Sequence, residues 1–503
     1  MKTIAQLQQQ NAELKALLIQ KDLEIAQKEA RIAYLHEQFI LARQKQFGPS
    51  AEHFAEQGDL FNEAEAIADD EASEPEKQAI SYTRHKPARK SLPKDLPREQ
   101  IIHDIENKMC GDCGHELHQM GEDKSEKLEF IPAQIKVIEH IRPKYSCRHC
   151  EKHGIAVQIQ QAHLPAMPIE KGIATASLLS HLITYKYQYG LPLYRQESMF
   201  KQYGIELSRK TMSDWVLKSA QLLTPLYEKL TQVLLAQGIL HADETVVNVV
   251  KSDKTNHYMW VYCSGTDTIH PNNSQPNIVL FDYQPSRSAR CVVDYLSGYS
   301  GYLQVDGYQA YEKTAATLVG CWAHARRKFM EAKKVQGKHK TGKADVVLTL
   351  IQKLYAVEAE IKDKSPPDKF AVRQVRSQPI LETLRQWLEK KQSTVVGNSK
   401  LIEAIHYLAN QWPKLIVYMR DGRLNIDNNR AERAIKPFVI GRKAWLFSQT
   451  ANGATASAIL YSIVETAKAN GLVPFEYLTV CLGELSQPTY DIERLLPWNI
   501  KRW

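Results

Sequence analysis

Three acidic residues lie on separate segments that could bring their carboxylates together around a metal ion. Asp243 lies within the apolar run GILHADETVVNVV, and Asp306 lies near the end of GYLQVDGY. Glu432 follows much later, in NNRAERAIKP, among several bases. Carboxylate oxygens are hard ligands, so such a site would favour Mg²⁺ or Mn²⁺ over Zn²⁺. For Glu432 alone, a glutamate that only forms salt bridges is the competing interpretation.

Four cysteines form two Cys-x-x-Cys pairs, CGDC and CRHC, which are separated by 33 residues. Four thiolates suit a tetrahedral Zn²⁺, and a site closed by four protein ligands is structural rather than catalytic. His115 or His149 could replace one thiol, and redox or unrelated thiols are the alternative interpretation. The predicted zinc ligands are Cys110, Cys113, Cys147 and Cys150.

Basic residues accompany the acidic ones and could contact DNA phosphates. A helix, a glycine turn and a second helix that begins after Ser208 resemble a helix-turn-helix. An ordinary helical connector and solvated helix faces are the alternatives to DNA contact. The predicted DNA-contacting residues are Arg209, Lys210 and Thr211 on the second helix, His324, Arg326 and Arg327 after the second carboxylate, and Arg430, Arg433 and Lys436 around the third.

The elements that must position the first two carboxylates are strands rich in β-branched and aromatic residues. Three consecutive strands are predicted, followed by a short helix, a fourth strand that ends near Asp306 and a fifth strand. Neighbouring side chains of a strand point to opposite faces, so Asp243 and Glu244 cannot both serve one site. The predicted strands are 238–250, 257–263, 277–283 and 301–308.

A helical, charged segment separates the first two carboxylates from the third. It carries no metal-ligand pattern, so we interpret it as an insertion into the core, with helix breaks near Pro366 and Pro379. After it, Asn428 or the next asparagine should cap a short helix. That helix carries Glu432 in its first turn, and Pro437 is expected to end it.

The whole chain predicts a multidomain α/β protein. Near the N-terminus apolar residues alternate at steps of three and four, with Asn11 at a core position, as in a coiled coil that joins two copies. A helix packed on its own chain is the alternative. The predicted divisions are a coiled-coil helix at 1–45, an acidic then basic linker at 46–100, a zinc-binding module at 101–160, a helix-turn-helix-like region at 165–235, a mixed-sheet core at 238–332 and 421–470, a helical insertion at 333–420 and a C-terminal segment at 471–503.

The composition indicates a globular protein with an anionic partner. The 503 residues are 43% apolar, which is enough for several cores, and the net charge is +8. No apolar run reaches the roughly 18 residues of a membrane span, and the polar start MKTIAQLQQQ is no signal peptide. Eight cysteines in so long a chain do not make a disulfide scaffold. We therefore expect a cytoplasmic protein without a membrane partner.

Four motifs, HADET, VDGYQAY, CWAHARRKF and NNRAERAIKP, occur in an order and at intervals that resemble the insertion-sequence-66 transposase family. That family belongs to the DDE transposases, which have a ribonuclease-H-like core. RQKQFGPSAE resembles its leucine-zipper-like region, the cysteine segment its zinc-binding domain and LTVCLGELSQ its C-terminal segment. By this resemblance, Asp243, Asp306 and Glu432 are the catalytic carboxylates and the ligands of the catalytic Mg²⁺.

The resemblance implies a bacterial, nucleoid-associated DNA transposase. It would bind the ends of its element in double-stranded DNA, cleave them and join the freed 3′-hydroxyl to target DNA. Two metal ions about 3.5–4 Å apart would serve the attacking and leaving oxygens. Family members often occur beside two small accessory proteins. A stand-alone nuclease and a DNA-binding regulator with an inert core are the alternatives.

Overall fold

The computed structural model describes the chain in several ranges. They are most residues between 14 and 39, and then 135–145, 160–252, 254, 256–266, 275–335, 342–392 and 399–500. The four predicted zinc ligands and the predicted linker at 46–100 lie outside the described residues. Two compact units are distinguished, Met1–Ala72 with Pro165–Trp503, and Ser73–Leu164. Within the described ranges, no helix has the length and apolar character that crossing a membrane requires.

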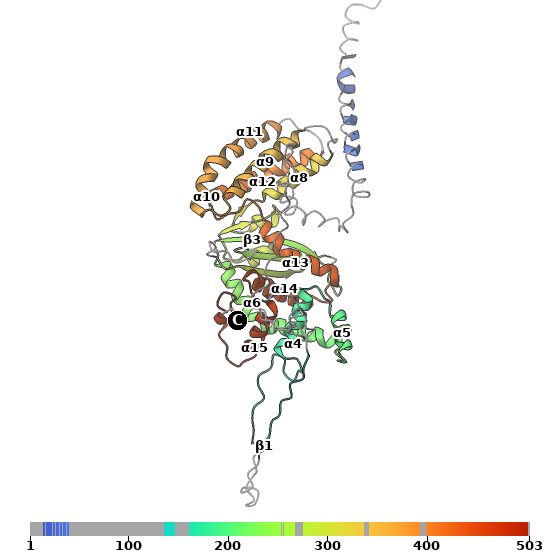
Figure 1. The fold of residues 1–503 in the computed structure, drawn as a ribbon. Helices are drawn as coiled ribbons and strands as arrows, with labels where there is room; N and C mark the ends of the chain where they lie inside the picture. The colour runs from blue at the N-terminus through green and yellow to red at the C-terminus, as the bar shows by residue number, and fades with distance from the viewer. Residues whose placement is uncertain are drawn as a thin grey trace, which may run out of the picture. The chain divides into compact units, whose positions relative to one another are not determined.

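A five-stranded mixed sheet lies in the larger unit (Figure 1). Its strand order is β5-β4-β3-β6-β7, with β4 antiparallel to both neighbours and β6 parallel to both neighbours. The predicted succession of three strands, a short helix and two further strands is confirmed. The bounds are β3 Ile239–Val247, β4 His257–Ser264, β5 Ile278–Gln284, α7 Ala289–Tyr295, β6 Tyr302–Gln304, the 3-10 helix η1 Gln309–Lys313, and β7 Thr317–Val319.

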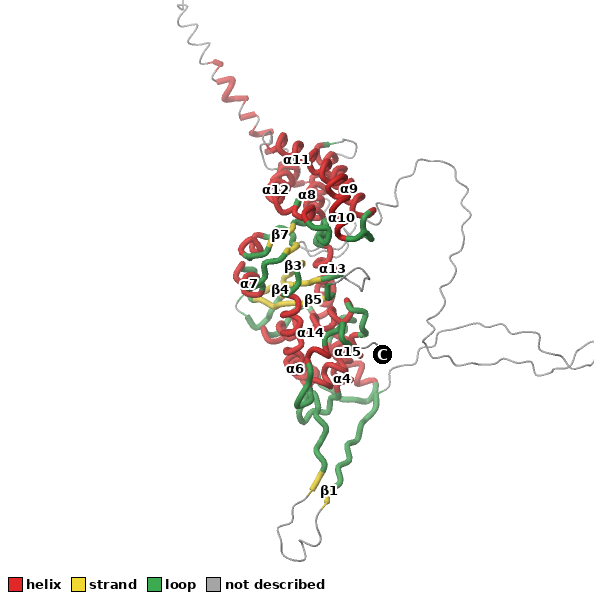
Figure 2. The backbone as a smooth tube through the Cα atoms, turned by 90° about the vertical axis from the view of Figure 1, so that its left-hand side faces the viewer, coloured by secondary structure: helices red, strands yellow, loops and turns green. Residues whose placement is uncertain are grey.

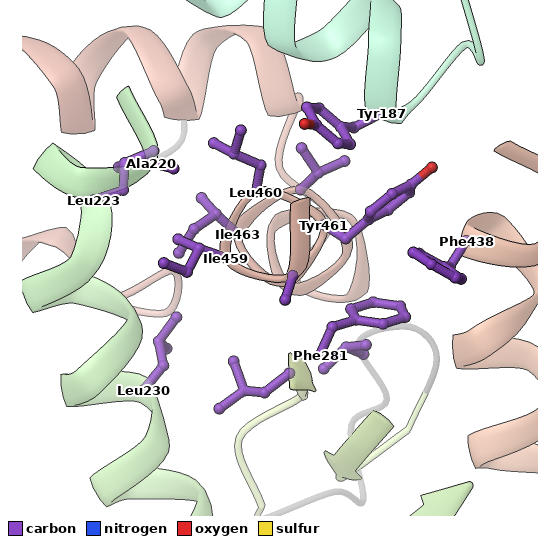
Figure 3. Close-up of a cluster of buried hydrophobic side chains, with 14 of the residues drawn as sticks. Tyr187, Ala220, Leu223, Leu230, Phe281, Phe438, Ile459, Leu460, Tyr461 and Ile463 are labelled. Carbon is purple, nitrogen blue, oxygen red and sulfur yellow. The ribbon is translucent and has the colours of Figure 1, made fainter. Parts of the chain in front are cut away.

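The main hydrophobic core joins the sheet to helices from both ends of the described chain. Three of these helices precede the sheet in sequence, and three follow the insertion. Figure 3 shows α14 in the middle of this core, with side chains directed toward α6, α13 and β5. The bounds are α4 Ala176–Tyr187, α5 Leu193–Gln202, α6 Arg209–Leu235, α13 Asn429–Trp445, α14 Ala451–Ala469 and α15 Pro474–Leu485, with the short helix η4 Ile492–Leu495 after them.

The predicted helix–turn–helix pattern before the sheet is present as α5, a turn and α6. Gly204 has a φ of +73° in that turn, a conformation that glycine adopts without steric cost. Ser208 caps α6 as predicted, because its Oγ accepts a hydrogen bond from the backbone N–H of Thr211 at 3.2 Å.

One face of the sheet is covered by α13 and α14. Asp243, Val261 and Phe281 lie side by side on this face of β3, β4 and β5. The ring of Phe281 is 6.0 Å from the ring of Phe438 on α13 and 5.6 Å from that of Tyr461 on α14. Asp243 therefore lies on the face against which α13 packs.

The opposite face is covered by α7 and η1. Glu244 lies opposite Trp260 in the strand register. The ring of Trp260 meets Tyr311 of η1 edge to face, with centroids 5.8 Å apart. Tyr262 stacks on Tyr295 of α7 at 4.1 Å. The two acidic neighbours of β3 thus point into different environments, as predicted.

The outer edge of β5 is closed by hydroxyl groups of α14. The backbone N–H groups of Val279 and Phe281 donate to Thr466 Oγ1 and Ser462 Oγ, at 3.0 and 2.7 Å. Thr466 Oγ1 also donates to the carbonyl of Val279 at 2.8 Å. Edge strands with free N–H groups can pair with other chains. Two hydroxyls one helical turn apart satisfy those groups here.

The segment predicted to be an insertion, called the insertion below, contributes to a second hydrophobic core of helices beyond β7 (Figures 1 and 2). Pro366 is the first residue of α10, where a missing N–H is tolerated, so the predicted break there is confirmed. Pro379 does not break a helix, because a π-helical turn precedes it and α11 runs through it. The bounds are α8 Trp322–Val335, α9 Lys343–Glu360, α10 Pro366–Val372, η2 Arg373–Ser377, α11 Gln378–Gln392, α12 Lys400–Leu415 and η3 Val417–Arg420.

The described residues between 14 and 39 are helical, as predicted. Apolar side chains of the predicted seam, including Leu18, Ile25, Ile32 and Phe39, are exposed in the single chain.

In the smaller unit, β1 (Lys144–Tyr145) pairs antiparallel with β2 (Gln160–Gln161). Arg142 Nε donates to the carbonyl of Ala162 at 2.6 Å and extends this pairing. The described part of this unit therefore contains a short antiparallel strand pair.

Candidate active site

The three predicted carboxylates come from three neighbouring elements. Asp243 lies in β3 and is 8% exposed, and its Oδ1 accepts a hydrogen bond from the N–H of Glu244 at 2.8 Å. Asp306 lies two residues beyond β6, and its Oδ1 accepts from the N–H of Tyr308 at 2.9 Å. Glu432 lies in the first turn of α13 and is 6% exposed.

The charges of these carboxylates act on one another. Burial raises the pKa of Asp243 well above its usual range, and the carboxylates of Glu244, Asp306 and Glu432 raise it further. The hydrogen bond from the backbone N–H of Glu244 acts in the opposite direction. A buried carboxylate with acidic neighbours is an environment that a divalent cation would stabilise. The chemistry of these residues therefore fits a bound divalent cation.

The three carboxylates are not close enough together to form one group of metal ligands in this structure. Among the described residues, the group whose ligand atoms all lie within 4.8 Å of one another is Cys321, His324 and Glu432. Asp243 and Asp306 are not part of this group. Like charges repel, so a wider separation is expected for carboxylates without a cation between them.

The helix that carries Glu432 is longer than predicted. It continues through Pro437 to Trp445, so the prediction that Pro437 ends it is wrong. A proline inside a helix removes one backbone hydrogen bond. Here Ile435 and Phe438 on either side of it are almost fully buried in the main core, and this packing holds the helix together.

The residue before α13 connects that helix to β3. Asn428 occupies the N-cap position, as predicted, but its side chain does not cap the helix. Its Nδ2 donates to the carbonyl of Ala242 at 2.8 Å, and its Oδ1 is 3.3 Å from His241 Nδ1. Gln304 at the end of β6 donates to the carbonyl of Asn425 at 2.7 Å. The sheet thus fixes the start of the helix that carries the third carboxylate.

A buried arginine of the insertion also holds the chain segment that leads to α13. Arg373 is 1% exposed and forms a bidentate pair with Glu358. Its guanidinium also donates to the carbonyls of Tyr418, Asp421 and Leu424 at 2.9, 3.0 and 2.9 Å. These carbonyls belong to the chain that leads to α13, so the insertion positions that chain.

Two tyrosines of the insertion also reach the neighbours of the carboxylates. Tyr355 of α9 donates to Asp427 Oδ2 at 3.1 Å, and Tyr407 of α12 donates to the carbonyl of Asp306 at 2.6 Å. Gly307 follows with a φ of +107°, which strongly favours glycine. The sequence interpretation assigned no role to these tyrosines or to Arg373. The glycine directly after Asp306 was the one local signal that the backbone turns sharply there.

Glu244 has partners that Asp243 lacks. Its Oε1 accepts from Arg287 Nη2 at 2.5 Å, and its Oε2 accepts from Tyr311 Oη at 2.7 Å. Burial and the charge of Asp306 raise the pKa of Glu244 to about 7, against the opposing effects of Arg287 and Tyr311. The charge of Asp306 therefore raises the pKa of acidic residues on both faces of β3, Asp243 and Glu244.

His324, one of the predicted DNA-contacting residues, is not a cation in the folded chain. Burial, together with the positive charge of Arg327, lowers the pKa of His324 to about 4. The imidazole is therefore neutral near pH 7. Its Nδ1 lies 3.5 Å from Glu432 Oε1, and its side chain is 17% exposed.

The other predicted DNA-contacting residues divide into exposed and internal ones. Arg430 is internal rather than on the surface, because it is 5% exposed and donates to the carbonyl of Ser264 at 3.2 Å. Arg209 is exposed and pairs with Glu197 at 3.1 Å. Of the rest, Lys210 and Arg433 are exposed, and Thr211, Arg326, Arg327 and Lys436 are half-buried.

Four family models match successive parts of the chain. The one described as "Transposase IS66 family" matches residues 171–456, and the one described as "zinc-finger binding domain of transposase IS66" matches 107–151. Residues 34–101 match "Transposase C of IS166 homeodomain", and 462–498 match "IS66 C-terminal element". The first match alone spans the three carboxylates and the whole insertion.

Relatives of similar length occur in Sinorhizobium fredii (strain NBRC 101917 / NGR234). The uncharacterized protein y4jD is 34% identical over 82% of this chain and 81% of its own length. The uncharacterized protein y4hP is 31% identical over 84% of this chain and 78% of its own length. A third, y4qI, is 34% identical over 80% of this chain and 76% of its own length.

Proposed function

Because the chain belongs to the IS66 family of transposases, we propose that it binds the ends of an insertion sequence and catalyses metal-dependent cleavage and transfer of DNA strands. The observation that carries the proposal is the environment of Asp243. Burial raises the pKa of its carboxylate, and the charges of Glu244, Asp306 and Glu432 raise it further, the last two from distant parts of the chain. Acidic groups are costly to bury together unless a cation binds them.

Asp243, Asp306 and Glu432 would hold divalent cations, Mg²⁺ or Mn²⁺. When bound, such ions supply charge stabilisation and an activated oxygen for in-line phosphoryl transfer. The protein's own contribution is to fix the three carboxylates. Asp306 is held through its carbonyl by Tyr407, and the chain before Glu432 is held by Arg373.

The strand order supports a ribonuclease-H-like DDE core. The strand that carries Asp243 is central, and the parallel strand beside it leads directly to Asp306. We propose core boundaries of 238–332 and 421–470, with an insertion at 333–420. In this proposal the insertion supports the chain segment that leads to α13 and thereby positions Glu432.

DNA would be contacted at several places. Three of the proposed contact residues are the first three residues of α6, whose N-terminus is capped by Ser208. They are Arg209, Lys210 and Thr211. Near the carboxylates, the accessible bases are Arg326, Arg327, Arg433 and Lys436. We further propose that Cys110, Cys113, Cys147 and Cys150 hold a structural Zn²⁺.

Self-association would occur through the N-terminal helix. Apolar side chains such as Leu18 and Ile25 are exposed in the single chain, although a coiled coil would bury them. Two copies could then bring two element ends together in the cytoplasm. Small accessory proteins of the same element are further proposed partners.

The test is cleavage and joining of labelled DNA that carries the ends of the element, in Mg²⁺, by wild type and two variants. We expect Asp243→Asn to lower cleavage on the order of 10³-fold or more. Asp282→Asn, which changes a half-buried aspartate on β5 of the same sheet, is the matched control and should cleave like wild type. Mg²⁺ should raise the Tm of wild type and of the control, but not that of Asp243→Asn.

Other outcomes would redirect the assignment. Cleavage that persists in Asp243→Asn would show that the carboxylates are assigned wrongly. Cleavage without joined products would favour a stand-alone nuclease. Binding without cleavage by wild type, even with the accessory proteins added, would favour a regulator with an inert core.

A further inference from the structure

A second group of potential metal ligands lies beside the proposed catalytic carboxylates. Cys321 directly precedes α8, and His324 lies in the first turn of that helix. Their ligand atoms and a carboxylate oxygen of Glu432 all lie within 4.8 Å of one another. His324 Nδ1 has no hydrogen-bond partner among the described residues, although it lies 3.5 Å from Glu432 Oε1.

The backbone around Cys321 suits a thiolate. Its Sγ accepts a hydrogen bond from the N–H of Asn428 at 3.2 Å, and the N–H of His324 acts on it in the same way. The thiol also lies at the N-terminal end of α8, where the helix dipole favours negative charge. Burial and Glu432 oppose ionisation and raise the pKa of this thiol. A cation between the two groups would remove that opposition.

The chemical types of these ligands select the metal. Sulfur and imidazole ligands are poor for Mg²⁺ and good for Zn²⁺ and related transition metals. Imidazole binds metals through its ring nitrogens, and His324 Nδ1 is 3.5 Å from a carboxylate oxygen of Glu432. Three protein ligands leave one position of a tetrahedral zinc ion open.

We propose that Cys321, His324 and Glu432 form a binding site for Zn²⁺ or a similar transition metal, separate from the four-cysteine module. Binding releases the thiol proton of Cys321 to solvent and forms one bond each from sulfur, nitrogen and oxygen to the metal. The site lies inside the proposed catalytic core, at the contact between α8 and the start of α13.

Glu432 connects this site to catalysis. This part of the inference rests on the proposed function, in which Glu432 is also a ligand of the catalytic cation. A zinc ion that draws Glu432 toward His324 withdraws it from Asp243 and Asp306. Zinc should therefore raise the Mg²⁺ concentration needed for half-maximal cleavage.

The first test measures the zinc bound per chain in the full-length protein after dialysis against a buffered concentration of free Zn²⁺ that saturates the wild type. Cys321→Ser, His324→Asn and Glu432→Gln should each bind one equivalent less than wild type. Cys291→Ser is the matched control, because it removes a half-buried thiol outside the group, and it should keep the wild-type content. With Co²⁺ in place of Zn²⁺, the wild-type minus Cys321→Ser difference spectrum should show a sulfur-to-cobalt charge-transfer band.

Equal zinc content in wild type and in the folded variants would overturn the site, whether or not the protein cleaves DNA. Circular dichroism identifies any variant that does not fold, and the remaining two variants then decide. If the site binds zinc but zinc leaves the Mg²⁺ dependence of wild-type cleavage unchanged, the sharing of Glu432 is wrong. A protein that never cleaves DNA still gives a result on zinc content, so the two proposals fail separately.

Discussion

Two adjacent acidic residues on opposite faces of β3 have different hydrogen-bond partners and different neighbouring charges. On one face, the Glu244 side chain is 2% exposed and has a cation, Arg287, and a hydroxyl donor, Tyr311, as partners. On the other face, Asp243 has the backbone N–H of Glu244 as a hydrogen-bond donor, and the charges that act on it are those of other carboxylates. Both are buried, and burial is the first cause of a raised pKa for each.

This difference separates a structural carboxylate from one that has no counter-charge among the causes of its pKa shift in the described part of the chain. The protein supplies the positive charge for Glu244 itself. For Asp243 the neighbouring charges are negative, so binding of a cation from solution would stabilise the folded chain. The contrast can be tested by measurements that need no DNA.

The largest expected effect is on the stability of the protein in Mg²⁺-free buffer at pH 7.5. A raised folded-state pKa means that ionisation of Asp243 costs stability at this pH, so Asp243→Asn should raise the free energy of unfolding by about 1–3 kcal/mol. Glu244→Gln should change it by less than about 1 kcal/mol, since the gain from removing the charge is offset by the lost pairing with Arg287. Chemical denaturation measures both values, and equal stabilisation by the two variants would contradict the comparison.

A second measurement isolates burial from the effect of neighbouring carboxylates. Asp282 lies on the same face as Glu244, and burial raises its pKa to about 6. Its ionisation therefore reduces stability as pH rises from about 4 through 6. Asp282→Asn should add about 1–2 kcal/mol at pH 7.5 and almost nothing at pH 4. A gain of the same size at both pH values would show that charge is not the cause.

The smallest expected effect concerns the cation on the Glu244 face. Arg287 is 43% exposed, so solvent weakens its interaction with Glu244. Arg287→Met should raise the pKa of Glu244 above about 7 and reduce stability by about 0.5–1 kcal/mol at pH 8.5, where Glu244 is ionised. At pH 5.5, where Glu244 is protonated, this loss should disappear.

Arg290→Met is the control for that measurement. Arg290 pairs with Asp294 at 3.4 Å on the surface of α7, and both side chains are exposed. Surface pairs of this kind contribute little. If Arg290→Met showed a pH-dependent loss of stability as large as that of Arg287→Met, the loss in Arg287→Met could not be attributed to its pairing with Glu244.

Local patterns in the sequence were sufficient to predict the sheet strands and most helices. β3, β4 and β5 have long apolar or alternating runs, and Ser208 and Gly204 mark the start of α6 and the turn before it. The same local reasoning failed at Pro437, where a proline signal predicts a helix end. Tertiary burial of Phe438 outweighs that signal, and burial of this kind cannot be read from neighbouring residues.

The support of the candidate site could not be predicted, because it depends on contacts between distant residues. Arg373 reaches the carbonyl of Leu424 51 residues away, and Tyr407 reaches that of Asp306 across 101 residues. The neutral state of His324 likewise depends on burial by distant elements. The sequence motifs revealed the acidic residues, but not which side chains hold them in position, nor that Cys321 lies beside His324 and Glu432.

The insertion also lengthens the interval over which the site is completed during protein synthesis. Asp306 and Glu432 are 126 residues apart (432 − 306), and the insertion lies between them. At about 5–20 residues per second, a ribosome needs roughly 6–25 s to pass from one to the other. Through that interval the nascent chain carries two carboxylates without the third. A product that terminates within the insertion would contain all five strands of the sheet and still lack Glu432.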